Sequence, residues 1–206
     1  MLKVIKKTIK ATILNIIVAL LSVIIILSAV YSVFGAKIEE TVSLASKITI
    51  DIGQKEAVEP IKIDSENKIT NYPEYGTKYA NIEIPKIDVN LPVYYGDTLE
   101  VLKKGVGHSS GSYFPGEGGS IIYMGHNAKK IFRRFSELQI GNEITIKASY
   151  GTYKYKIYDM KLIKETDINE LPVQREKEIL MIYTCYPFNN IGYASKRFVV
   201  YAELEK

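Results

Sequence analysis

Cysteine is nearly absent from this sequence, and Cys185 is the only one among its 206 residues. A single thiol cannot form an internal disulfide, so the fold must rest on its hydrophobic core. The chain also lacks a Cys-x-x-Cys pair and has only two histidines, which argues against a structural zinc site. A lone cysteine is either a structural core residue or a nucleophile, and its surroundings decide between the two.

Tryptophan is absent as well, whereas tyrosine, which favours strands, occurs 16 times. Most of the chain carries no net charge, because four lysines within the first ten residues account for the whole net charge of +4. The remainder is balanced, so we expect no basic patch for nucleic acid. The composition favours a β-rich body behind a basic N-terminal tail.

A stretch without any charged residue follows this tail and covers residues 11–34. Its 24 residues are enough to cross a bilayer, which takes roughly 20 apolar residues. A cleaved signal peptide is the alternative, but its apolar part is shorter, about 7–15 residues. Lysines ahead of the stretch predict a cytoplasmic N-terminus and an extracellular remainder. We expect a cytoplasmic tail over 1–10, a single transmembrane anchor over 11–34, a stalk over 35–77 and a compact domain over 78–206.

The expected domain consists of short apolar runs that are separated by turn residues. Residues 81–95 alternate between apolar and polar side chains, and Pro85 and Pro92 confine these strands to bends or edges. The other expected elements are a hairpin around Gly151, a short helix capped by Thr98 and a helical segment over residues 129–138. About eight strands with two short helices and no βαβ alternation predict an all-β barrel or sandwich.

Two of the buried strands end on residues that can carry chemistry. Cys185 ends one apolar run, and His126 follows another over residues 120–124. In a small barrel, two such ends can lie at the same rim. A nucleophilic cysteine needs a partner of this kind, because an isolated thiol has a pKa of about 8.5 and must be activated. We therefore interpret Cys185 as a nucleophile and His126 as its acid–base partner.

Arg197 begins the last expected strand. If the final two strands form an antiparallel hairpin, the start of one lies opposite the end of the other, and Arg197 lies beside Cys185. A guanidinium stays charged and offers several donors, so it can hold a substrate carbonyl or stabilise an oxyanion. Three such residues at three strand ends favour an active site over a structural cysteine.

These residues resemble the motifs of the sortases, which are membrane-anchored cysteine transpeptidases of mainly Gram-positive bacteria. The matching motifs are Gly125-His126-Asn127, Tyr183-Thr184-Cys185 and Arg197, in this order and behind a membrane segment. The usual Thr-Leu-x-Thr-Cys motif differs here at its first two positions, which are Met181 and Ile182. The sequence Cys-Tyr-Pro-Phe over residues 185–188 is similar to class D sortases.

The resemblance implies an eight-stranded sortase-type β-barrel with two short helices. It also implies cleavage of a Leu-Pro-x-Thr-Gly-like sorting signal after Thr, through a cysteine thioester, and transfer of the acyl group to an amine of the cell-wall precursor lipid II. The implied partners are secreted proteins with a C-terminal sorting signal. Carried onto this chain, the nucleophile is Cys185, the general acid/base is His126 and the oxyanion donor is Arg197. The implied substrate-binding residues are Thr184, Tyr186 and Asn127, while His108 has no firm role and is expected in a loop.

No cofactor or metal is expected. Acidic residues near the site loops are more often solvated than metal-binding, so calcium has no support from Glu117, Glu165 or Asp167. We expect the loops over residues 173–177 and 186–196 to wall the site. Two alternatives remain: a thiol hydrolase acting on the same signal, and a catalytically silent membrane-anchored β-domain.

Overall fold

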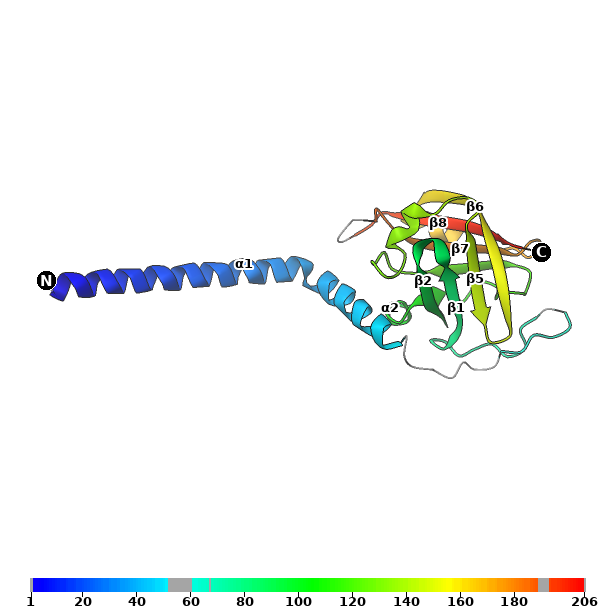
Figure 1. Cartoon of the computed structure of the whole chain (residues 1–206), viewed down its shortest axis with the longest axis horizontal. Coiled ribbons are helices and arrows are strands. Elements are labelled where there is room, and N and C mark those ends of the chain that lie inside the picture. The colour runs from blue at the N-terminus through cyan, green and yellow to red at the C-terminus, as the bar shows by residue number, and fades with distance from the viewer. Residues whose placement is uncertain (1, 52–60, 67, 189–192, 206) are drawn as a thin grey trace. The chain divides into compact units, whose positions relative to one another are not determined.

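A computed structural model of the chain describes residues 2–51, 61–66, 68–188 and 193–205 (Figure 1). Helix α1 runs from Leu2 to Asp51. Its segment Thr12–Ser32 has 21 residues and a mean hydropathy of 3.0, so it is long and apolar enough to cross a membrane. The chain divides into two compact units, residues 1–42 and 43–206.

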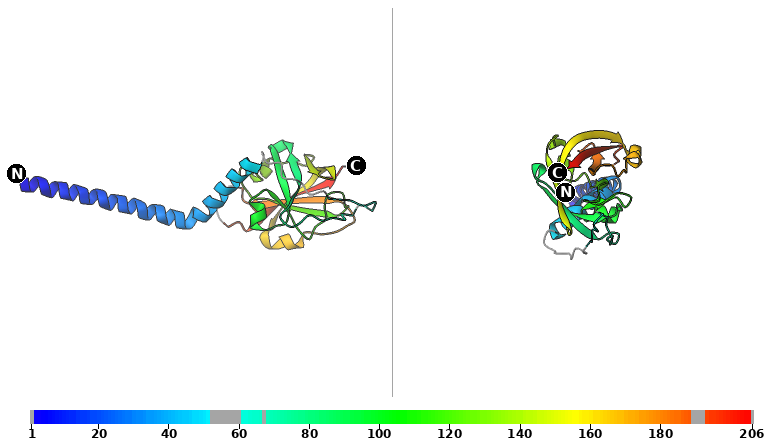
Figure 2. Two further views of the ribbon diagram at one scale, coloured as in Figure 1. Left: turned by 90° about the horizontal axis from the view of Figure 1, so that it is seen from below. Right: turned by 90° about the vertical axis from the view of Figure 1, so that its right-hand side faces the viewer.

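Eight strands of the second unit close into one barrel (Figures 1 and 2). Their order around the barrel is β1, β2, β3, β4, β7, β8, β6, β5. The strands are β1 (Lys78–Ile84), β2 (Val89–Tyr95), β3 (Val106–His108), β4 (Ser120–Met124), β5 (Glu143–Ala148), β6 (Gly151–Lys164), β7 (Ile179–Tyr186) and β8 (Lys196–Leu204). Strands β2 and β3 pair in parallel, as do β4 and β7, and the other neighbours are antiparallel. This confirms the expected eight-stranded β-barrel.

Alternation along the strands separates an inner from an outer face of the barrel. Leu180 and Ile182 of β7 belong to the main core, together with the predicted apolar residues of β1 and β2. Met181 of the same strand packs in a second cluster with Ile122 of β4 and Val199 of β8. The residues of this cluster alternate along the three strands with those of the main core, so the cluster lies on the outer face of the strands. Cys185 has the same parity as Met181 and belongs to this outer face.

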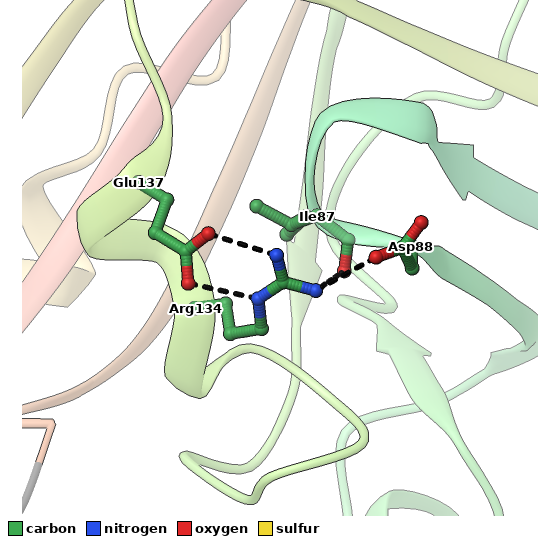
Figure 3. Close-up of polar contacts among 4 residues, drawn as sticks. All are labelled: Ile87, Asp88, Arg134 and Glu137. Atoms are coloured by element: carbon green, nitrogen blue, oxygen red, sulfur yellow. Dashed lines mark hydrogen bonds and ion pairs between the residues drawn. The ribbon is translucent and has the colours of Figure 1, made fainter.

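The two predicted short helices are present, but one is shorter than expected. Helix α2 (Leu99–Leu102) begins after Thr98, whose side chain accepts a hydrogen bond from the Val101 N–H, which confirms the predicted cap. The segment predicted over 129–138 forms only the five-residue 3-10 helix η2 (Arg133–Glu137). Arg134 holds η2 with one local contact, to Glu137 on the same helix, and one tertiary contact, to Asp88 in the turn between β1 and β2 (Figure 3).

The segment directly before β1 packs on the barrel. Ile61 and Ile69 are buried members of the main core. The Glu117 carboxylate accepts hydrogen bonds from the Ile69 N–H at 3.1 Å and from the Tyr72 hydroxyl at 3.2 Å. Glu117 is itself buried, which corrects the expectation that this side chain is solvated. The domain limits drawn from the sequence stay a prediction, but these contacts join residues 61–72 of the expected stalk to the barrel.

These contacts predict where the N-terminal helix can be removed. A chain that begins at residue 59 should be soluble and should unfold cooperatively, because it keeps Ile61 and Ile69. A chain that begins at residue 77 loses both side chains, and its free energy of unfolding should fall by at least about 2 kcal/mol. Urea unfolding of the two proteins measures the difference. Equal stability, or loss of cooperative unfolding in both, would contradict the packing described for this segment.

Candidate active site

Three neighbouring strands bring the predicted catalytic residues into one row. Cys185 of β7 lies directly opposite Arg197 of β8 in the antiparallel register, as the hairpin argument predicted. On the other side of β7, Met124 is the partner of Tyr183, and the next N–H of that chain bonds the Tyr183 carbonyl at 3.2 Å. His126 lies in the turn two residues beyond Met124, as Cys185 lies two residues beyond Tyr183, so we expect the two side chains at the same end of the sheet. Their catalytic roles stay predictions.

Cys185 is a half-buried free thiol on the outer face of β7. Its face is shared by Tyr183, whose hydroxyl bonds the Met124 sulfur at 3.3 Å. Reactive cysteines are found in partly exposed positions, whereas structural ones are inert in the core. The location of Cys185 therefore fits a nucleophile better than a core thiol.

A groove of about 380 Å³ runs along this outer face. Its strand side is formed by Ile122, Met124 and Tyr183, and Leu171 and Val173 of the segment between β6 and β7 also line it. Val173 belongs to the loop that was predicted to wall the site. The second predicted wall, residues 186–196, includes positions 189–192, which lie outside the described residues. Asp97 and Ser109 line the groove as well, so its wall is partly polar. The groove adjoins Tyr183, two residues from the thiol.

His126 and Asn127 lie in the turn that follows β4, and both are half-buried. The Asn127 side-chain amide donates a hydrogen bond to the Pro187 carbonyl at 2.9 Å, and the Asn127 carbonyl accepts one from Arg133 at 3.1 Å. Asn127 thus ties the turn that carries His126 to the turn that follows Cys185. This contact indicates that Asn127 holds the two strand ends together, while its predicted contact with substrate stays a prediction.

The other two predicted substrate-binding residues have different surroundings. Thr184 is only 1% exposed and lies on the face of β7 opposite to Cys185, so it can shape the site only from beneath. This burial is at odds with direct substrate contact. The Thr184 hydroxyl has no hydrogen-bond partner among the described residues. Tyr186 is half-buried, with its ring 5.4 Å from that of Phe188, and its substrate contact stays a prediction.

Arg197 is held by three hydrogen bonds. Its Nη1 donates to the carbonyls of Ala194 at 2.6 Å and Lys196 at 3.0 Å, and its Nη2 donates to the Glu165 carboxylate at 2.6 Å. A hydrogen bond from Tyr193 and the charge of Arg197 lower the pKa of Glu165. The sequence had indicated only a solvated Glu165, and its pairing with Arg197 could not be read from local spacing.

The second histidine is not in a loop, which corrects the expectation for His108. It ends β3, is fully buried, and its Nδ1 and Nε2 lie 2.9 Å from the Tyr79 hydroxyl and 3.0 Å from the Ser112 hydroxyl. Burial lowers the pKa of His108 to about 3. A neutral, fully buried imidazole cannot reach a substrate in the outer groove, so His108 has a structural role.

This burial predicts how stability depends on pH. In the unfolded chain His108 takes up a proton near its ordinary pKa of about 6.5, whereas in the fold it stays neutral down to about 3. The unfolded state therefore binds more protons between these values, and the free energy of unfolding falls as the pH drops through this window. His108→Gln should flatten the slope between pH 7 and 5, measured by urea unfolding. The wild type, unfolded over the same pH range, is the reference, and an unchanged slope in His108→Gln would contradict the prediction.

The described residues contain no group of three or more His, Cys, Asp or Glu side chains that could hold a metal ion. The acidic residues considered for calcium have other partners instead. Glu165 pairs with Arg197, and Asp167 accepts a hydrogen bond from the Lys164 N–H at 3.3 Å. Both carboxylates therefore form hydrogen bonds or ion pairs within the described part of the protein.

Known proteins are similar to this chain in sequence and in fold. A family model described as a sortase domain matches residues 82–205. Sortase D of Bacillus subtilis (strain 168) is 40% identical over 139 residues, which cover 68% of this chain and 70% of that protein. Sortase A of Listeria monocytogenes is 26% identical over 130 residues, or 62% of this chain and 56% of that one. The structure of a Clostridium perfringens Sortase D5 transpeptidase has a TM-score of 0.60 and 29% identity, and the match covers 66% of this chain and 83% of that one.

Proposed function

The chain belongs to the sortase family, and we propose that this cysteine transpeptidase cleaves a Leu-Pro-x-Thr-Gly-like sorting signal after Thr and transfers the acyl group to an amine of the cell-wall precursor. The similarity to class D sortases that residues 185–188 predict agrees with the 40% sequence identity to Sortase D of Bacillus subtilis. The observation that carries the proposal is the register that sets Arg197 opposite Cys185, together with the bond from Asn127 to Pro187 that brings the turn with His126 to the same end of β7. A groove lies along this face.

In the first half-reaction, His126 takes the proton of the Cys185 thiol, the sulfur attacks the Thr carbonyl carbon of the signal, and the carbonyl oxygen becomes an oxyanion. Arg197 donates hydrogen bonds to that oxygen, because a guanidinium has five N–H donors and its three described bonds can coexist with another. His126 gives a proton to the departing amine, the C–N bond breaks, and a thioester forms.

In the second half-reaction, an acceptor amine attacks the thioester. His126 takes a proton from the amine, the C–S bond breaks, and a new amide joins the client to the acceptor. Water competes with the amine, so the site must favour aminolysis over hydrolysis. The half-burial of Cys185 and His126 supports this selectivity, because it limits the access of bulk water.

The groove suits the apolar part of the signal. Leu and Pro of the peptide would lie along Ile122, Met124 and Val173, and the Thr carbonyl would reach Cys185. Burying these side chains contributes roughly 25 cal/mol per Å² of apolar surface. The apolar segment Thr12–Ser32 supports a membrane location for the enzyme, with the catalytic barrel outside the cell, where secreted clients and precursor amines are available.

The proposal is tested by product analysis of the full chain in detergent micelles. A panel of Leu-Pro-x-Thr-x peptides is incubated with and without an added amine, and the products are identified by mass spectrometry. A transpeptidase yields an amide at the Thr carbonyl when amine is present, whereas a thiol hydrolase yields only the free acid. Cys185→Ala should yield neither. Absence of cleavage together with an unreactive thiol would instead indicate a catalytically silent domain.

A further inference from the structure

Arg197 has its guanidinium fixed from two sides, which is unusual for a long and flexible side chain. The carbonyls of Ala194, just before β8, and Lys196, its first residue, accept hydrogen bonds from Nη1, and the Glu165 carboxylate accepts one from Nη2 at 2.6 Å. The Arg197 side chain is only 14% exposed, whereas Arg134, in a comparable Arg–Glu pair on η2, is 40% exposed. A sheltered, charge-assisted bond of this length is stronger than an exposed one.

Glu165 is itself held in place by the backbone. It begins the 3-10 helix η3 (Glu165–Glu170), and its N–H donates to the Ser195 carbonyl at 2.9 Å. Ile163 of β6 is the register partner of Arg197 on β8, so Glu165 lies just beyond the end of the fourth strand in the row. The Glu165 carboxylate therefore cannot drift with a mobile loop end without breaking this backbone bond.

We propose that Glu165 is a positioning residue that orients the Arg197 guanidinium for the oxyanion. This inference rests on the proposed function of the row. Without the carboxylate, Arg197 would have acceptors only on its Nη1 edge and could rotate about its terminal bonds. A misplacement of about 1 Å at a catalytic group costs on the order of a hundredfold in rate. Glu165 need not touch the substrate to have this effect.

The opposite role is also physically possible, because the same ion pair would hold Arg197 away from the substrate if it had to break before turnover. Under that alternative, removal of the carboxylate would raise the rate. The backbone bond that fixes Glu165 and the further bonds on Nη1 favour positioning, since each of them uses atoms other than those of the Nη2–carboxylate bond.

The first test measures orientation without any substrate. The chain has only four arginines, so their Nε–H signals can be resolved in ¹⁵N NMR spectra of the full chain in micelles, and Arg197→Ala assigns the relevant one. We expect a high heteronuclear NOE for Arg197 in the wild type and a strongly reduced one in Glu165→Ala. Glu137→Ala, which alters the comparable pair of Arg134 away from the row, is the matched control and should leave the Arg197 signal unchanged.

The second test is a double-mutant cycle on peptide transpeptidation. Glu165→Ala should lower kcat/KM by roughly tenfold to a hundredfold, mainly through kcat, and Glu165→Gln should recover part of the loss because its amide oxygen still accepts. In the Arg197→Ala background, Glu165→Ala should cost nothing more, because its effect passes through Arg197.

An unchanged Arg197 NOE in Glu165→Ala, additive losses in the cycle, or a faster Glu165→Ala enzyme would each overturn the positioning role. These outcomes differ from a failure of the proposed function. If Cys185→Ala retained transpeptidation, the assignment of the row would be wrong. If peptides were not turned over at all, the NMR comparison would still decide whether Glu165 orients Arg197.

Discussion

Replacing His126 by alanine should remove turnover and leave the fold intact. His126 lies in the turn after β4, which Asn127 joins to the turn after Cys185, and we expect it there to exchange a proton with the departing and the incoming amine. General acid–base catalysis contributes about 10²–10⁴-fold to a rate, so kcat/KM should fall by at least this factor. The residue lies outside the main core, so the urea midpoint should stay close to that of the wild type. Peptide transpeptidation and urea unfolding measure the two quantities on the same protein.

The other histidine provides the control for this experiment. His108 is fully buried inside the barrel, so His108→Gln should reduce stability at neutral pH but keep turnover in the molecules that remain folded. Wild-type cleavage by His126→Ala would remove the acid–base role from His126. Because His108 cannot reach the outer groove from its buried position, that result would end the interpretation of this row as an acid–base site.

Arg197→Lys should lower kcat/KM by about 10²–10³-fold, the usual loss when one oxyanion donor is removed. Lysine keeps the positive charge but lacks the planar fork that bonds Glu165 and the Ala194 carbonyl at the same time. Because the charge is kept, the pH dependence of Cys185 alkylation should change little. Peptide kinetics and iodoacetamide rates over a pH range measure the two effects separately.

The two readouts distinguish the roles that Arg197 can have. Near-normal turnover by Arg197→Lys would show that a charge is enough and that the fork holds no substrate oxygen. A clear change in the pH dependence of alkylation, in parallel with the loss of turnover, would point instead to stabilisation of the thiolate. Glu137→Gln is a suitable control for the general effect of changing an Arg–Glu pair, since its partner Arg134 contacts Ile87 and Asp88 between β1 and β2 (Figure 3).

The parts of the site that could be predicted from the sequence depend on local patterns. Alternating side chains define the strands, and an antiparallel hairpin places the start of β8 opposite the end of β7, which brings Arg197 beside Cys185. The capping role of Thr98 is equally local, because a side chain and an N–H three residues apart are sufficient.

The contacts that the sequence did not reveal join positions far apart in the chain. Glu165 pairs with Arg197 across β6 and β8, and Glu117 bonds the backbone of Ile69 in the segment before the barrel. Burial of His108 likewise depends on Tyr79 of β1. An acidic residue or a histidine in a polar stretch is usually exposed, so only the closed barrel shows which of them acquire buried partners.

The most direct test of the account is intact-mass analysis of the enzyme during turnover. The full chain in micelles is mixed with an efficiently cleaved Leu-Pro-x-Thr-x peptide in the absence of added amine and quenched in acid. We predict a covalent adduct with the mass of the peptide up to its Thr, located at Cys185, which disappears when an amine is added and yields the amide. Cys185→Ala should form no adduct. Cleavage without an adduct at Cys185, or equal cleavage by Cys185→Ala, would contradict the assignment of this cysteine as the nucleophile.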